Sequence, residues 1–314
     1  FTKLTAVDLD GETIIGKAAS PTTVREDITI GLKNALAALE ADIGSQEYHV
    51  KLASSSAAGG LKMVAVGLVP ELTLEAAKRA ALGAGANLTG SFAYELNAAE
   101  VSRIEALAPD VLLLCGGTDG GNKEVVVHNA AALAASSITA PLIYAGNKVV
   151  ADRCRELLAR SRKEVIVTDN VMPRLGELSV ENVRAAIREV FIRHIVQAKG
   201  LAKARQYVES ILMPTPTAVL RAATLLADGT PEEEGLGELL VVDVGGATTD
   251  VHSVGWGGVF PGAVKKGVPE PYAKRTVEGD LGVRYNAPSI LAAVGEEGLS
   301  AYLNQPVADL NRHT

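Results

Sequence analysis

Two carboxylates, Asp243 and Asp250, frame a run of glycine and threonine in the apolar segment VVDVGGATTDVHSV, residues 241–254. Glycine permits a tight turn and close approach of the backbone, and exposed amides in such a turn can bind phosphate oxygens. Carboxylates can hold the waters of a Mg²⁺ ion, which prefers oxygen ligands. The alternative is an ordinary β-hairpin with acidic ends. The candidate catalytic and metal-facing residues are Asp243 and Asp250, and the candidate phosphate-binding residues are Gly245, Gly246, Thr248 and Thr249.

A second glycine loop, CGGTDGGN, occupies residues 115–122. It follows an apolar run and precedes a helical pattern, the place where ligands and anions bind in doubly wound sheets. Asp119 would repel a phosphate, so the loop is either packed for structural reasons or contacts another ligand or a protein. Its candidate residues are Gly116, Gly117, Asp119 and Asn122.

A third segment, KRTVEGDLGVR at residues 274–284, mixes bases and acids. Lys274, Arg275 and Arg284 could face phosphate, and the alternative is a solvated loop with internal ion pairs. The five histidines are scattered without metal-ligand spacing.

The elements that position these groups follow from the hydrophobic pattern. Residues 1–17 predict a β-hairpin around the turn DLDG, followed by a helix over residues 24–40 with an N-cap in SPTT. Residues 61–171 alternate near-continuous apolar strands with helices, one of which we expect Thr73 to cap. This alternation predicts a Rossmann-like parallel sheet covered on both faces. Residues 180–227 are helical in pattern with a break at MPTPT, and the acidic stretch DGTPEEEGLGE precedes a new strand at residue 239.

Composition narrows the function classes. The 314 residues are 47% hydrophobic and carry a formal net charge of −7, which supports a large core and argues against a nucleic-acid partner. The sequence shows neither a span for a membrane nor a signal peptide, and its two cysteines suit a reduced compartment, so we expect a cytoplasmic protein. The oligomeric state stays open.

The segment around Asp243 resembles the second phosphate motif of the actin, Hsp70 and sugar-kinase superfamily. Upstream, PTPTAVLRAATLLADG resembles the interdomain helix of those ATPases, with Pro216, Thr217 and Ala218 matching its start. The resemblance implies an α/β fold of ribonuclease H-like lobes that bind ATP and Mg²⁺. It places residues 1–60 and 176–237 in the first lobe, residues 61–175 in an inserted Rossmann-like domain, and residues 238–314 at the start of an incomplete second lobe. The first phosphate motif would precede Phe1, so we expect both termini to be truncated.

A closer resemblance covers essentially the whole chain. FTKLTAVDL, SSSAAGGLKMVAVGLVPELT, LLLCGGTDGGN, PLIYAGN and KRTVEGDLGVRYNA are similar to the MutL family associated with glutamate mutase, which is unrelated to the mismatch-repair protein of that name. The resemblance implies an ATP-dependent reactivating chaperone for an adenosylcobalamin-dependent aminomutase, in which nucleotide-driven lobe motion releases damaged cobalamin. Alternatives are a small-molecule kinase and a nucleotide-dependent actin-like scaffold. Dinucleotide binding is disfavoured because the pattern Gly-x-Gly-x-x-Gly is missing after the first strand of the Rossmann-like block.

Overall fold

The computed structural model describes residues 1–23, 26–55, 61–161, 163–198, 207, 210–246, 248–256, 268, 270–278, 281–283 and 287–304. Internal contacts divide the chain into two compact units, Phe1–Ala58 with Arg188–Pro214, and Gly59–Ile187 with Thr215–Thr314. The second unit joins residues that the sequence assigns to three different domains. Contact units need not coincide with evolutionary domains, so the predicted domain boundaries stay a prediction.

The first unit contains an antiparallel hairpin and a helix that packs on it. Strands β1 (Thr2–Asp8) and β2 (Thr13–Ser20) pair around a turn in which Asp8 accepts hydrogen bonds from the backbone of Asp10 and Gly11. Helix α1 (Ile28–Ile43) places Leu39 and Ile43 against Gly16 of β2. Strand β3 (Leu52–Ser55) pairs in parallel with β9 (Ser210–Pro214). The predicted first hairpin is therefore confirmed.

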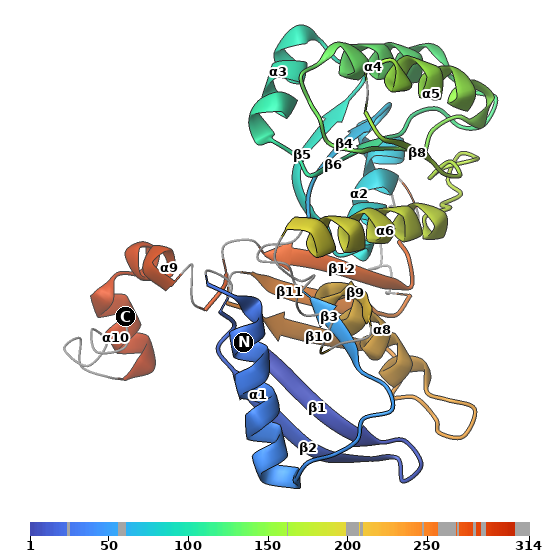
Figure 1. Ribbon diagram of the computed structural model, residues 1–314. Helices are drawn as coiled ribbons and strands as arrows, with labels where there is room; N and C mark the ends of the chain where they lie inside the picture. The colour runs from blue at the N-terminus through green and yellow to red at the C-terminus, as the bar shows by residue number, and fades with distance from the viewer. Residues whose placement is uncertain are drawn as a thin grey trace. The chain divides into compact units, whose positions relative to one another are not determined.

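The second unit is built on a five-stranded parallel sheet of order β5-β4-β6-β7-β8. The strands are β4 (Lys62–Gly67), β5 (Asn87–Ala93), β6 (Val111–Leu114), β7 (Leu142–Tyr144) and β8 (Val165–Val167). Figure 1 shows helices α3 (Ala98–Leu107), α4 (Glu124–Ala135) and α5 (Ala151–Ala159) together on one side of this sheet. Helix α2 (Glu75–Gly83) lies on the other side, and Arg184 from the start of α6 (Glu181–Ala198) lies against its Gly83.

The sheet strands are buried on both faces, as their apolar runs predict. Val64, Leu112 and Leu114 pack into the core on the side of α3 to α5, while Met63 and Ala65 point to the other face and are equally buried. The predicted α/β layer with a parallel sheet is confirmed.

The same unit carries a second, antiparallel sheet of order β10-β11-β12. Its strands are β10 (Leu239–Val244), β11 (Thr249–Val254) and β12 (Ala273–Glu278), and helix α8 (Thr215–Asp228) packs on it. Ala223 and Ala227 of α8 contact Val254, with Leu239 and Val241 beside them. Helices α9 (Ala287–Val294) and α10 (Glu296–Leu303) follow. In the part of the chain described, no helix combines the length and the apolar character needed to cross a membrane.

Several local predictions need correction. Helix α1 begins at Ile28 rather than residue 24, because the Asp27 carboxylate accepts from the backbone of Thr29 and caps the helix there. Thr73 does not cap α2: its hydroxyl accepts from the backbone of Leu68 and Val69, and a wide turn over Pro70–Leu74 precedes the helix. Residues 210–214 are a strand, since a short apolar run beside an open strand edge pairs as readily as it coils.

Candidate functional site

Strands β10 and β11 form the tight hairpin that the sequence predicts for residues 239–254. Asp243 lies opposite Asp250, Val244 lies opposite Thr249, and the Gly245 amide donates to the Thr248 carbonyl at 2.9 Å. A Cβ on Gly245 would stand 2.8 Å from that carbonyl oxygen, so the turn requires glycine there. A phosphate motif and an ordinary hairpin share this geometry. The choice between them depends on which side chains and amides have no partner inside the protein and could bind a ligand.

The two carboxylates share one face of the sheet but have different surroundings. Residues directly opposite in an antiparallel pair point to the same side. Asp250 is 6% exposed, and its Oδ1 accepts from Nη2 of Arg275 at 2.7 Å and from Nε at 3.1 Å. Asp243 is half-buried and has no hydrogen-bond partner among the described residues. Asp243 is therefore the carboxylate that is available to a ligand at this hairpin.

Arg275 extends the same network to α2. It lies on β12 opposite His252, is 8% exposed, and donates through Nη1 to the carbonyls of Leu82, at 3.2 Å, and Ala86, at 3.5 Å. Lys274 points to the opposite face and pairs with Glu270. The segment 274–284 thus begins as a strand and not as a solvated loop, and Arg284 lies outside the described residues. A phosphate contact by Lys274 or Arg275 stays a prediction.

Some threonines and glycines of the turn form hydrogen bonds within the protein, and others could bind a ligand. The Thr249 hydroxyl donates to the Leu281 carbonyl at 2.6 Å, and the Val283 amide donates to the Gly245 carbonyl at 3.0 Å. Gly246 is exposed, and the half-buried Thr248 hydroxyl has no partner in the described part of the chain. A phosphate or Mg²⁺ contact by Asp243, Gly246 and Thr248 stays a prediction. Asp250 does not fit as a direct Mg²⁺ ligand while it holds Arg275.

His252 is a feature of this site that the sequence did not single out. It is 0% exposed, and neither ring nitrogen has a hydrogen-bond partner among the described residues. Burial lowers the pKa of His252, Asp250 acts in the opposite direction, and the guanidinium of Arg275 lowers it further. A neutral imidazole is therefore packed beside the Asp250–Arg275 pair.

The glycine loop lies where predicted, between β6 and α4, and its conformation is fixed from within. Gly117 has φ +71°, and a Cβ there would stand 2.2 Å from the carbonyl oxygen of Asn122. The Asn122 side chain accepts from the Val125 amide and so caps the start of α4. The fully buried Asn147 donates to the carbonyls of Gly121 and Asn122. Gly116, Gly117 and Asn122 thus have structural tasks in this loop.

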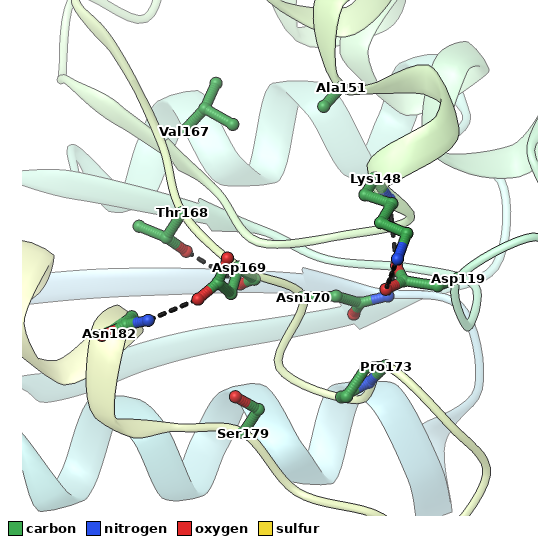
Figure 2. A pocket seen from close by; sticks show the side chains of 10 residues that line it. All are labelled: Asp119, Lys148, Ala151, Val167, Thr168, Asp169, Asn170, Pro173, Ser179 and Asn182. Atoms are coloured by element: carbon green, nitrogen blue, oxygen red, sulfur yellow. Dashed lines mark hydrogen bonds and ion pairs between the residues drawn. The ribbon is translucent and has the colours of Figure 1, made fainter.

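Asp119 points from the loop into a cavity of about 650 Å³ at the carboxyl edge of β6, β7 and β8. Figure 2 shows Asp119 and Lys148 on one side of it, Asp169 and Asn182 on the other, and Asn170 between them. Partial burial would raise the pKa of Asp119, but hydrogen bonds from Asn170 and Lys148 and the ammonium charge hold it below its ordinary value. The sequence offered a signal for these residues: GNK follows one predicted strand and TDN the next.

Comparison with known proteins identifies the family. The family model described as MutL protein matches residues 1–313. Protein MutL of Clostridium tetanomorphum is 50% identical over 313 residues, which are 99% of this chain and 68% of that protein. A solved short-chain flavodoxin associated with a non-canonical PDU bacterial microcompartment covers 42% of this chain and 97% of its own, at 14% identity and a TM-score of 0.31, which is too low to carry an argument. The first two matches confirm the resemblance drawn from the motifs: the chain belongs to the MutL protein family.

Proposed function

We propose that this chain forms the nucleotide-binding part of an ATP-dependent reactivating chaperone that serves an adenosylcobalamin-dependent aminomutase of the glutamate mutase type. The observation that carries the proposal is the tip of the β10–β11 hairpin. There, among the described residues, Asp243, Gly246 and Thr248 remain available, while Asp250, Thr249 and the Gly245 carbonyl are engaged in holding the turn. The available groups are of the kinds that bind a phosphate and its hydrated cation. Family membership supports the choice of client.

In this proposal the actin-like and Hsp70-like architecture supplies the site, and the chemistry is phosphoryl transfer from ATP to water. The Gly246 amide and the Thr248 hydroxyl bind phosphate oxygens, as exposed turn amides do in other phosphate sites. Asp243 orients water bound near the phosphates. Asp250 does not contact the nucleotide in this proposal. It positions Arg275, and the pair holds β11 and β12 in register beneath the turn. Bound Mg²⁺ would supply neutralisation of the phosphate charge.

The closure of two lobes around the nucleotide would drive the conformational change in the bound aminomutase. Hinge closure around a ligand is a common route from a local binding event to a domain motion. A mutase that retains a damaged cobalamin stays inactive until the cofactor leaves. Nucleotide-driven opening of the mutase complex would allow that exchange.

The test uses the full-length protein with a glutamate mutase inactivated by bound damaged cobalamin. ATP turnover and recovered mutase activity are measured together, for the wild type, for Asp243→Asn and for the control Asp152→Asn. Asp152 is an exposed α5 residue whose side chain is 92% exposed. We expect mutase-stimulated turnover and reactivation in the wild type and the control, and loss of both in Asp243→Asn. Turnover stimulated by a metabolite instead of the mutase, or nucleotide-dependent polymers in sedimentation, would replace the proposal by a kinase or a scaffold.

A further inference from the structure

A second binding site lies in the same compact unit, at the cavity bounded by the loops after β6, β7 and β8. These loops contribute Asp119, Lys148 and the segment from Thr168 to Asn182, respectively. Doubly wound parallel sheets bind ligands at the carboxyl ends of their strands. The cavity volume of about 650 Å³ lies within the range of small-molecule sites, roughly 300–1,000 Å³.

Buried amides fix the walls of this cavity in place. Asn170 is 3% exposed; its Nδ2 donates to the Gly117 carbonyl at 2.9 Å and to Asp119 Oδ1 at 3.0 Å, and its Oδ1 accepts from the Met172 amide. Asn147 joins the glycine loop to the loop after β7 in the same way. Asp119 and the glycine loop are therefore held in place before a ligand arrives, which reduces the entropy cost of binding at that wall.

The negative charge of the cavity disfavours anions, and its ligand set does not suit a metal ion. Asp119 and Asp169 face a single ammonium, Lys148 Nζ, which lies 3.4 Å from Asp119 Oδ2. The resulting negative balance disfavours phosphate. A metal ion is equally disfavoured, because no group of three or more His, Cys, Asp or Glu side chains among the described residues is placed to hold one. A neutral ligand that forms hydrogen bonds can use both the carboxylates and the Lys148 ammonium.

The unsatisfied groups are mostly acceptors. Asp169 is exposed, and the one described partner of its carboxylate is the Asn182 amide, on Oδ2. Asp119 Oδ2 meets the Lys148 ammonium, whose side chain is 75% exposed and keeps N–H groups for another acceptor. The Ser179 hydroxyl has no partner within the described residues. A carboxylate oxygen pair with nearby donors suits a ligand with adjacent hydroxyl groups, each of which donates and accepts.

We propose that this cavity binds a neutral vicinal diol, the cis hydroxyl pair of a ribose, through the carboxylate of Asp169, with Ser179 as a donor and with Asp119 and Lys148 contacting the ligand from the opposite side. Ala151, Val167 and Pro173 form the apolar part of the lining and contact the carbon skeleton of the ligand. A ribose can come from a nucleoside, a nucleotide or a free pentose. The nucleoside is the favoured source, because it joins the diol to a flat aromatic base without a phosphate.

The test measures binding to the 314-residue chain by ligand-observed NMR and calorimetry with adenosine, 2′-deoxyadenosine, ribose and adenosine monophosphate. We expect adenosine to bind about tenfold more tightly than 2′-deoxyadenosine, which corresponds to about 1.4 kcal/mol. Asp169→Asn removes one charge, keeps an acceptor for Asn182, and should weaken adenosine binding about tenfold. Adenosine monophosphate should bind more weakly than adenosine, because its phosphate meets the negative balance.

Two further variants separate this site from the proposed ATP site. Asp152→Asn on α5 is the neutral control and should leave adenosine binding unchanged, and Asp243→Asn on β10 reports any adenosine that the ATP site holds. Adenosine binding that depends on Asp243 and not on Asp169 would belong to the ATP site and overturn the proposal. Equal binding of 2′-deoxyadenosine, tighter binding of the monophosphate, or no binding of any probe at millimolar concentration would overturn it as well. None of these results bears on mutase-stimulated ATP turnover, so the two proposals fail separately.

Discussion

Replacing Arg275 with methionine tests whether the buried Asp250–Arg275 pair fixes the sheet beneath the candidate nucleotide site. Arg275→Met keeps an apolar stem of similar length and removes the guanidinium. Asp250, which is 6% exposed, then loses its opposite charge. Removal of one partner from a buried ion pair costs about 3–5 kcal/mol. The carbonyls of Leu82 and Ala86 lose their donor at the same time. We therefore expect Arg275→Met to lower the free energy of unfolding by an amount in the upper part of that range.

The double variant Asp250→Leu with Arg275→Met is the matched control. It replaces the ion pair by an apolar pair, which is often neutral or stabilising in a buried position. We expect the double variant to be more stable than Arg275→Met alone, so that the two changes are far from additive. Urea unfolding is followed by the fluorescence of Trp256, the single tryptophan of the sequence, whose ring centroid lies 5.1 Å from that of Tyr272. If Arg275→Met lowered the free energy of unfolding by less than about 1 kcal/mol, the value of an exposed ion pair, the reasoning would be refuted.

Three further predictions concern other buried groups. Burial keeps the pKa of His252 below its ordinary value, so below about pH 6.5 the unfolded state takes up a proton on this side chain before the folded state does. The free energy of unfolding should therefore fall as the pH drops below about 6.5. His252→Leu should remove this part of the pH dependence of the urea midpoint. Gly117→Ala forces a Cβ against the Asn122 carbonyl at positive φ and should cost at least about 1–2 kcal/mol in urea unfolding, whereas an unchanged midpoint would show that the loop adapts. Cys115 and Cys154 are buried with raised thiol pKa values, so a thiol reagent should label them only as fast as the protein opens, and rapid labelling of the native protein would contradict their burial.

The parallel sheet could be predicted because its strands are apolar without interruption. VLLL of β6 and LIY of β7 are buried on both faces, and each is followed by a glycine and a helix, so sequence alone indicates strand, loop and helix in order. Strand β5, NLTGSFA, escaped prediction for the opposite reason. It lies at the edge of the sheet, where one side has no strand neighbour, and its composition is polar. The opposite edge strand, β8, keeps the apolar run VIV and was predicted, so it is the composition of β5 and not its edge position alone that hid it.

The candidate site shows a different limit. The spacing of Asp243, Gly245 and Asp250 predicted a hairpin, and the hairpin is there. The partner of Asp250 lies 25 residues further along the chain, on a strand that the sequence did not reveal. No local pattern marks such a pair, because burial by α2 and β12 creates it. The same holds for the cavity at β6 to β8, whose lining residues come from three separate segments of the chain, 119, 148–151 and 167–182.

Arg275 also bears on how the hairpin is coupled to the rest of its compact unit. Its guanidinium donates to Asp250 on β11 and to two carbonyls at the end of α2, in several directions from one planar group. A lysine has a single ammonium on a flexible stem and cannot reproduce that set of directions. When β11 moves, either α2 moves with it or the buried charged hydrogen bonds of Arg275 break. Because these bonds are buried, breaking them leaves unpaired groups, and moving the two elements together costs less. If Asp243 binds nucleotide as proposed, the binding would be transmitted to the parallel sheet through α2, and Arg275→Met would uncouple the two.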